Sequence, residues 1–134
     1  MKQGIQTLFP DENLRRYGCY FFCFVEWAER FGNRDFNSDE IIALFEEAKE
    51  LEFVNKEAFI FNPPQLLNLM LGWNSFSRVR ILKEAPQHDI YVVYLKKPGF
   101  GHFMLYDKGQ LWDPLDPARP GAKGYEPYSF REVT

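Results

Sequence analysis

The sequence predicts an α+β fold in which N-terminal helices pack on a C-terminal antiparallel sheet. Two observations predict it: helical apolar spacing bounded by capping residues fills the first half of the 134 residues, and β-rich runs joined by turn signals fill the second. Helices that precede a set of strands, rather than alternating with them, are typical of this class. Because 46% of the residues are hydrophobic and no internal repeat or linker divides the chain, residues 1–134 are expected to form a single domain.

Three helices are predicted in the first half. The first runs from about Gly18 to Phe31, because the glycine-asparagine pair at 32–33 is a C-terminal stop signal. The second begins after Asn37, whose spacing to Glu40 matches a capping box, and its apolar stripe continues to residue 51. The third occupies 62–72, with an asparagine cap and two prolines at its start and a glycine at its end.

The second half predicts strands at 78–82, 89–95, 102–106, 110–112 and 128–133. The third and fourth form a hairpin around Asp107-Lys108-Gly109, for which two registers are open. A two-residue turn places Asp107 opposite Gln110 and leaves His102 diagonal to Asp113 on one face, where a hydrogen bond between them is possible. A three-residue loop with a bulge shifts the register by one residue and turns Asp113 away.

Charge and hydropathy argue against two classes of partner. The formal net charge is −3 and the 16 lysines and arginines are dispersed, so the sequence has no basic footprint for nucleic acid. No apolar run approaches the roughly 20 residues that span a bilayer, and the N-terminus lacks the pattern of a secretion signal. We therefore expect a cytoplasmic protein that binds neither nucleic acid nor membrane.

Cys19, His102 and Asp113 form the most connected chemical proposal in the chain. Cys19 stands at the start of the first predicted helix, where the positive end of the helix dipole favours a thiolate. His102 and Asp113 lie on neighbouring strands and would complete a set of nucleophile, base and orienting residue. Each has an ordinary alternative: Cys19 as a small buried hydrophobic residue, and Asp113 as a turn opener before proline.

The second cysteine and the second histidine are interpreted as structural. Cys23 is surrounded by apolar residues, so we expect a buried free thiol, and a disulfide to Cys19 would strain a helix. His88 is expected at the surface or at a strand start. A zinc site built from Cys19, Cys23, His88 and His102 has enough ligands, but their spacing matches no known pattern, so we predict no metal and no other cofactor.

Three short motifs, taken in order, resemble the papain-like cysteine peptidases: Gly18-Cys19 at the start of a helix, Gly101-His102-Phe103 opening a strand, and Asp113-Pro114 closing the next. The chain is most similar to the bacterial branch that includes the double-glycine leader peptidases. The resemblance implies a papain-like fold, with Cys19 as nucleophile, His102 as general base and acid, and Asp113 as the residue that orients His102.

Two positions depart from that family. Asn13 stands six residues before the cysteine, where the family usually has a glutamine whose side-chain amide donates to the oxyanion. The asparagine has the same amide but is one methylene shorter, and its alternative role is that of a turn or cap residue. Tyr20-Phe21-Phe22 replaces the small residues that leave the family's thiol open, and these aromatic side chains are expected to narrow the cleft.

Two functions follow as expectations. The first is a cysteine hydrolase or acyl transferase that acts on an amide bond of a peptide or protein through Cys19, His102 and Asp113, with Asn13 holding the oxyanion. The alternative is an inactive papain-like domain that binds a peptide or protein in the same cleft. The substrate and the oligomeric state are not predicted.

Overall fold

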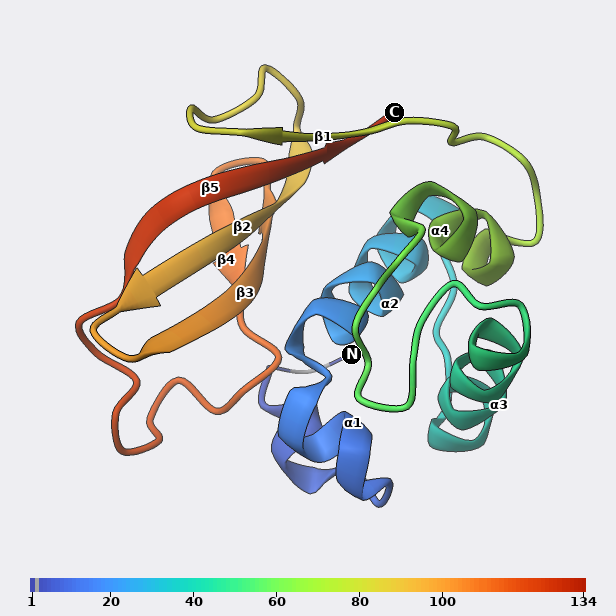
Figure 1. The fold of residues 1–134 in the computed structure, drawn as a ribbon, viewed down its shortest axis with the longest axis horizontal. Helices are drawn as coiled ribbons and strands as arrows, with labels where there is room; N and C mark the ends of the chain where they lie inside the picture. The colour runs from blue at the N-terminus through green and yellow to red at the C-terminus, as the bar shows by residue number, and fades with distance from the viewer. Residues whose placement is uncertain (2) are drawn as a thin grey trace.

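The computed structural model describes residues 1 and 3–134 and confirms the predicted α+β class (Figure 1). The helices are α1 (Glu12–Tyr17), α2 (Cys19–Gly32), α3 (Ser38–Glu50) and α4 (Pro63–Leu71), preceded by the 3-10 helix η1 (Ile5–Leu8). The strands are β1 (Val79–Leu82), β2 (Ile90–Lys97), β3 (Phe100–Asp107), β4 (Gln110–Trp112) and β5 (Glu126–Val133). Each predicted helix and strand is therefore present, with boundaries moved by a few residues.

The sheet is antiparallel throughout, and its strand order is β1-β5-β2-β3-β4. The C-terminal strand is thus inserted between β1 and β2. Figure 1 shows the helices gathered on one side of the sheet, with α2 between the sheet and α3 and α4. The closest packing joins α2 to β3 and to α4, while α3 packs on α4.

Side-chain caps begin α3 and α4 as the sequence predicts. The Asn37 side chain accepts a hydrogen bond from the Glu40 N–H at 2.8 Å, and the Glu40 carboxylate accepts one from the Asn37 N–H at 3.1 Å. This reciprocal pair is a capping box. At the start of α4, the Asn62 side chain accepts from the Gln65 N–H at 3.3 Å.

Two short elements before Cys19 were not predicted. Helix α1 has a cap signal, because the Asp11 side chain accepts a hydrogen bond from the Leu14 N–H at 2.9 Å. Because α1 has only six residues, its sequence is too short to show the helical spacing of apolar residues on which a helix prediction depends. The element η1 is shorter still, and its conformation depends on contacts with distant residues, such as the hydrogen bond from the Gln6 N–H to the Pro114 carbonyl at 3.0 Å.

Helix α2 is the centre of the core. Its residues 21–29 are all buried, because the sheet covers one side and α4 covers another. Cys23 is fully buried, which confirms the prediction for this thiol. Although this run is apolar, none of the helices in the described part of the chain is long and apolar enough to cross a membrane.

A charged cluster ties α2 to the sheet. The Glu26 carboxylate lies 2.6 Å from the Arg30 guanidinium, which reaches Asp107 at the end of β3 at 2.7 Å. Glu26 and Glu29 also accept hydrogen bonds from the Met1 ammonium group at 2.7 and 2.6 Å. The two buried carboxylates of α2 are therefore paired, as burial of charge requires.

The α3 cap leads to a stability prediction. Asn37→Ala should lower the free energy of unfolding by about 1 kcal/mol, because it removes the side-chain acceptor at the helix start. Urea unfolding followed by circular dichroism measures this change. The control is Ser38→Ala, one residue further along and exposed, which should change stability by less than about 0.5 kcal/mol. Equal effects of the two substitutions would contradict the role given to the cap.

Candidate active site

Gly18 lets α2 begin directly after α1 and so sets the position of Cys19. The Gly18 N–H closes α1 on the Leu14 carbonyl at 2.9 Å, while the Gly18 carbonyl accepts the first hydrogen bond of α2, from the Phe22 N–H at 2.8 Å. A Cβ atom at this position would stand 2.4 Å from the Leu14 carbonyl oxygen, so a side chain would force the two helices apart. Cys19 is consequently the first residue of α2, and it is half-buried.

The β3–β4 turn settles the register that the sequence left open. Lys108 and Gly109 both have positive φ angles, 48° and 89°, as a two-residue type I′ turn requires. Asp107 therefore pairs with Gln110, and Leu105 pairs with Trp112. The two-residue turn is confirmed and the three-residue loop is wrong.

His102 and Asp113 form the hydrogen bond that this register allows. The His102 Nε2 atom lies 2.7 Å from the Asp113 Oδ1 atom, and both side chains are buried. His102 lies near the start of β3, and Asp113 follows the last residue of β4. The imidazole is held in one orientation, and its second nitrogen, Nδ1, remains for another partner.

Cys19 is the candidate for that partner. Like the Asp113 carboxylate, Cys19 contributes to raising the pKa of His102, so it lies near enough to act on the ring. Because Nε2 is engaged by Asp113, Nδ1 is the ring atom that can serve the thiol. The Tyr125 ring lies 5.8 Å from the His102 ring, between centroids. The structure thus brings an imidazole and a carboxylate from distant positions into contact, and Cys19 acts on the same imidazole.

Asp113 is held by contacts that sequence reasoning missed. Its carboxylate accepts a hydrogen bond from the Leu115 N–H at 2.9 Å and lies 3.2 Å from the Arg119 guanidinium. Its backbone N–H donates to the Gln3 side chain at 3.0 Å, and its carbonyl accepts from the Gly4 N–H at 3.2 Å. The Asp-Pro-Leu sequence could have signalled the local turn, but no sequence pattern connects Gln3 or Arg119 to this carboxylate.

The electrostatics favour a charged pair. Burial opposes the charged imidazole, but Asp113 and Cys19 outweigh it, so the pKa of His102 lies above its ordinary value of 6.5. Burial also opposes the Asp113 carboxylate, but His102, the Leu115 N–H and Arg119 outweigh it, so the pKa of Asp113 is lowered. The stabilisation from this pair is therefore fully present between the ordinary pKa values of the two groups, 3.8 for the aspartate and 6.5 for the histidine.

Within residues 1 and 3–134, no hydrogen bond joins Asn13 to His102 or Asp113. Asn13 is the second residue of α1 and is half-buried. Among the residues that the structure describes, its side chain forms no hydrogen bond, so the amide is free to bind another group. The oxyanion role predicted for Asn13 stays a prediction.

Two of the three aromatic residues after Cys19 do not act as expected. Phe21 and Phe22 are fully buried in the core and do not narrow a cleft, because their positions on α2 point them inward. Tyr20 alone lies beside the thiol, where its ring stacks on Phe103 with centroids 4.1 Å apart.

Cys23 and His88 lie outside the cluster. Burial, followed by the charges of Cys19, Asp113 and Glu26, raises the pKa of the Cys23 thiol, which keeps it protonated. The His88 side chain is about half exposed, with its Nε2 atom 3.1 Å from the Glu132 carboxylate. Within residues 1 and 3–134, no three histidine, cysteine or acidic side chains are grouped as metal ligands would be.

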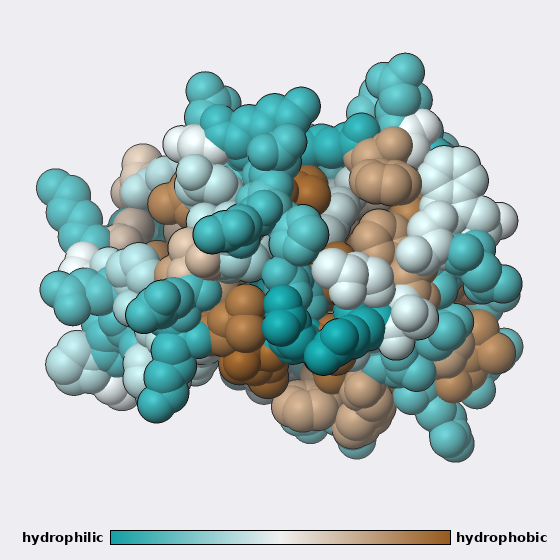
Figure 2. Space-filling view, turned by 90° about the horizontal axis from the view of Figure 1, so that it is seen from above, coloured by the Kyte–Doolittle hydropathy of each residue, from teal (hydrophilic) through white to brown (hydrophobic). Residues whose placement is uncertain are grey.

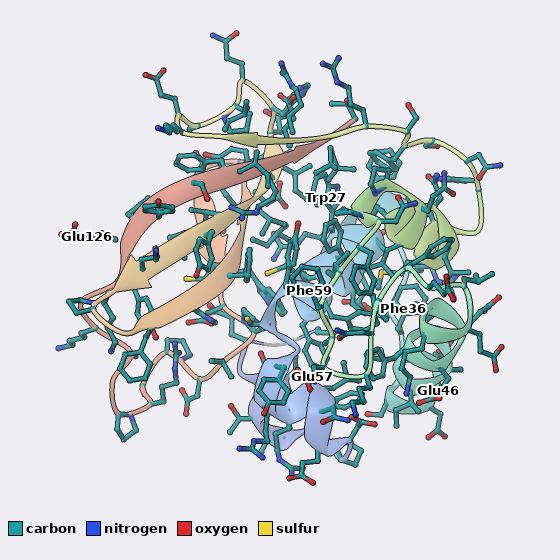
Figure 3. All side chains as sticks on the ribbon, viewed as in Figure 1. Trp27, Phe36, Glu46, Glu57, Phe59 and Glu126 are labelled. Atoms are coloured by element: carbon teal, nitrogen blue, oxygen red, sulfur yellow. The ribbon has the colours of Figure 1, made fainter. Side chains whose placement is uncertain are left out.

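Cys19 opens into a groove of about 470 Å³, which we call the Cys19 groove. Its other walls come from α1 and α2, from the 57–63 segment and from β1, β3 and β5. Figure 3 places Phe59 of this segment near the middle of the molecule, in front of α2, and Glu57 lower down beside α1. The groove gives a ligand access to the half-buried thiol.

The chain thus has an α+β fold with a buried hydrogen-bonded pair of His102 and Asp113, and Cys19 acts on the pKa of His102. Residues 1–131 match the model of a family described as "Protein of unknown function, DUF261", and the chain belongs to this family. No curated protein and no solved structure matches the chain.

The pairing of His102 with Asp113 predicts a pH dependence. Stability contributed by His102 is present below pH 6.5 and is lost as the pH rises through its raised folded-state pKa. In an NMR titration, the His102 ring should have a midpoint above 6.5, and Asp113→Asn should lower that midpoint because it removes the carboxylate. Signals are assigned with His88→Gln. Asp116→Asn, at a nearby exposed position, is the matched control and should leave the midpoint in place.

Proposed function

We propose that this protein is a cysteine hydrolase or acyl transferase that acts on an amide bond of a peptide or protein. The observation that carries the proposal is the buried contact of His102 in β3 with Asp113 after β4, together with the influence of Cys19, at the start of α2, on the pKa of the same histidine. Structural roles for each residue alone give no reason for this arrangement. The order of the three residues along the chain is that of the papain-like peptidases, so we propose that the protein is related to this class.

Each residue has a defined role in the reaction. The Cys19 sulfur attacks the amide carbonyl carbon, forming a C–S bond, while His102 accepts the thiol proton and gives it to the leaving amine as the C–N bond breaks. His102 then takes a proton from water, or from another nucleophile in a transferase, and the incoming oxygen or nitrogen displaces the Cys19 sulfur. Asp113 keeps the ring oriented and stabilises its charged form.

The start of α2 offers hydrogen-bond donors for the oxyanion. The first N–H groups of a helix have no acceptor within the helix, and the N–H of Cys19 is the first of α2. The Asn13 amide is the proposed second donor. Loss of one such donor typically costs about 3 kcal/mol of transition-state stabilisation, so Asn13 would affect the rate strongly without affecting the fold.

The second candidate function is that of an inactive binding module. It is favoured by the Cys19 groove, whose walls include the exposed aromatic side chains of Tyr17, Phe59 and Phe61. A groove of this kind can bind a peptide without any reaction at the thiol. In both cases the proposed partner is a peptide or protein, and the free thiols of Cys19 and Cys23 support a reducing compartment such as the cytoplasm.

Alkylation by iodoacetamide at neutral pH distinguishes the two functions. Cys19 should be labelled selectively over the buried Cys23, as located by mass spectrometry of peptides. His102→Ala should slow labelling of Cys19 by about 100-fold, a typical loss when a general base is removed.

The matched control is His88→Ala, which removes the other histidine and should leave labelling of Cys19 unchanged. Circular dichroism establishes that each variant is folded. Labelling of Cys19 that is no faster than that of a free cysteine, and that does not respond to His102→Ala, would support the binding module instead.

A further inference from the structure

Arg131 is the one charged side chain of the Cys19 groove that comes from the sheet. It lies in β5, paired with Ile81 of β1 on one side and with Val92 of β2 on the other. Its guanidinium carbon is 5.2 Å from the centroids of both the Tyr94 and Phe103 rings. The cation therefore rests on two aromatic rings, and one of them belongs to Phe103, the residue that follows His102.

The polar partners of Arg131 are neutral. Its guanidinium donates a hydrogen bond to the Ser129 hydroxyl. It also interacts with the Tyr20 hydroxyl: burial raises the pKa of Tyr20, and Arg131 opposes that increase by its charge and a hydrogen bond. These contacts fix the position of the guanidinium without neutralising it.

Other arginines of the molecule that approach the interior are paired with carboxylates. Arg30 contacts Glu26 and Asp107, and Arg119 contacts Asp113. For Arg131, no carboxylate of residues 1 and 3–134 lies within 4.0 Å. The remaining charged residue of the groove, Glu57, is exposed to solvent.

We infer that Arg131 binds a carboxylate of the peptide chain that Cys19 acts on. The inference rests on the proposed function, which it deepens by naming the substrate class: a peptide with an apolar residue and a carboxylate close to the scissile bond. A partly buried guanidinium without an anionic partner is the complement of a carboxylate, and a charge-assisted hydrogen bond is among the stronger polar contacts. The carboxylate belongs to an acidic side chain or to a free C-terminus.

The rest of the groove fits the apolar part of such a peptide. Its exposed walls include the side chains of Phe59, Phe61 and Ile81, which are 62%, 58% and 66% exposed. Figure 2, seen from above, shows exposed apolar side chains gathered near the middle of its lower edge, between hydrophilic ones. Exposed apolar side chains around a reactive residue are typical of a binding surface.

The edge of β1 supports an extended peptide rather than a small carboxylate. Arg78 and Thr134 exchange both backbone hydrogen bonds at 2.9 Å. Hydrogen-bonded pairs alternate along an antiparallel ladder, so the backbone N–H and C=O groups of Arg80 also point to β5. The N–H and C=O groups of Val79 and Ile81 therefore point to the open edge of the sheet, because β1 is an edge strand. Their side chains line the groove, so a peptide there also has backbone partners.

The inference is tested with three affinity labels that share one reactive group, an iodoacetyl-Leu unit. One carries a C-terminal Glu amide, one a Gln amide, and one a Gln with a free carboxyl group. In each case the Cys19 sulfur displaces iodide and forms a C–S bond, and the rate is measured by intact mass. The Glu or the free-carboxyl label should react about tenfold faster than the neutral Gln amide, and the faster of the two identifies the source of the carboxylate.

Arg131→Gln should bring this rate ratio close to one, and Arg131→Lys should retain part of it. Arg78→Gln removes a positive charge outside the groove and is the matched control, with the ratio unchanged. His102 is present in all these proteins, so its charge does not account for a difference between them. The ratio in the natural protein tests the inference even if a variant fails to fold.

A ratio near one in the natural protein, an unchanged ratio in folded Arg131→Gln, or no labelling of Cys19 by any of the three compounds would overturn the inference. The proposed function fails separately. If labelling is slow and unchanged by His102→Ala but still prefers a carboxylate, the proposed enzyme activity is wrong and the Arg131 site is supported. If labelling is fast and depends on His102 but shows no preference for a carboxylate, the proposed activity is supported and the Arg131 site is wrong.

Discussion

The backbone turn at Lys108-Gly109 is the constraint on which the site depends. Side chains alternate along a strand, so a slip of one residue would carry Asp113 to the other face of the hairpin. The positive φ angles of both turn residues hold the loop at two residues and so pair Asp107 with Gln110. From this pairing follows the 2.7 Å contact between His102 and Asp113, which fixes the orientation of the imidazole.

A second backbone constraint acts on the thiol from the other half of the chain. Gly18 allows α1 and α2 to meet almost without a linker, which leaves Cys19 at the first position of a helix whose next residues are buried in the core. The thiol is therefore held by packing of α2 against β3, the strand that carries His102. Two glycines, Gly18 and Gly109, thus determine where the thiol, the imidazole and the carboxylate lie.

The features that could be predicted from the sequence are those with local causes. The cap at Asn37, the stop at Gly32-Asn33 and the β-rich runs each depend on neighbouring residues, and all were found where expected. The hairpin register depends on a single turn, so the sequence could limit it to two choices.

The features that could not be predicted depend on contacts between distant segments. Arg119 reaches Asp113 from an irregular loop, and Gln3 reaches the same residue from the other end of the chain. Whether Phe21 or Tyr20 faces the thiol is decided by which side of α2 the sheet covers, a choice that helical spacing does not make because the aromatic residues are consecutive. The Cys19 groove likewise takes its walls from segments that no motif connects.

The charged side chains around the site differ in whether they have a partner of opposite charge. The buried carboxylate of Asp113 has two cationic neighbours, His102 and Arg119, whereas the cation of Arg131 rests on hydroxyl groups and aromatic rings. The formal charge of the whole chain is −3, and within the groove the exposed Glu57 offsets the formal charge of Arg131. What distinguishes Arg131 is therefore the absence of a carboxylate within 4.0 Å among the described residues, not a local excess of positive charge. Charge interactions between exposed groups weaken over about 10 Å in salt, so acidic residues further away than this have little influence on the guanidinium.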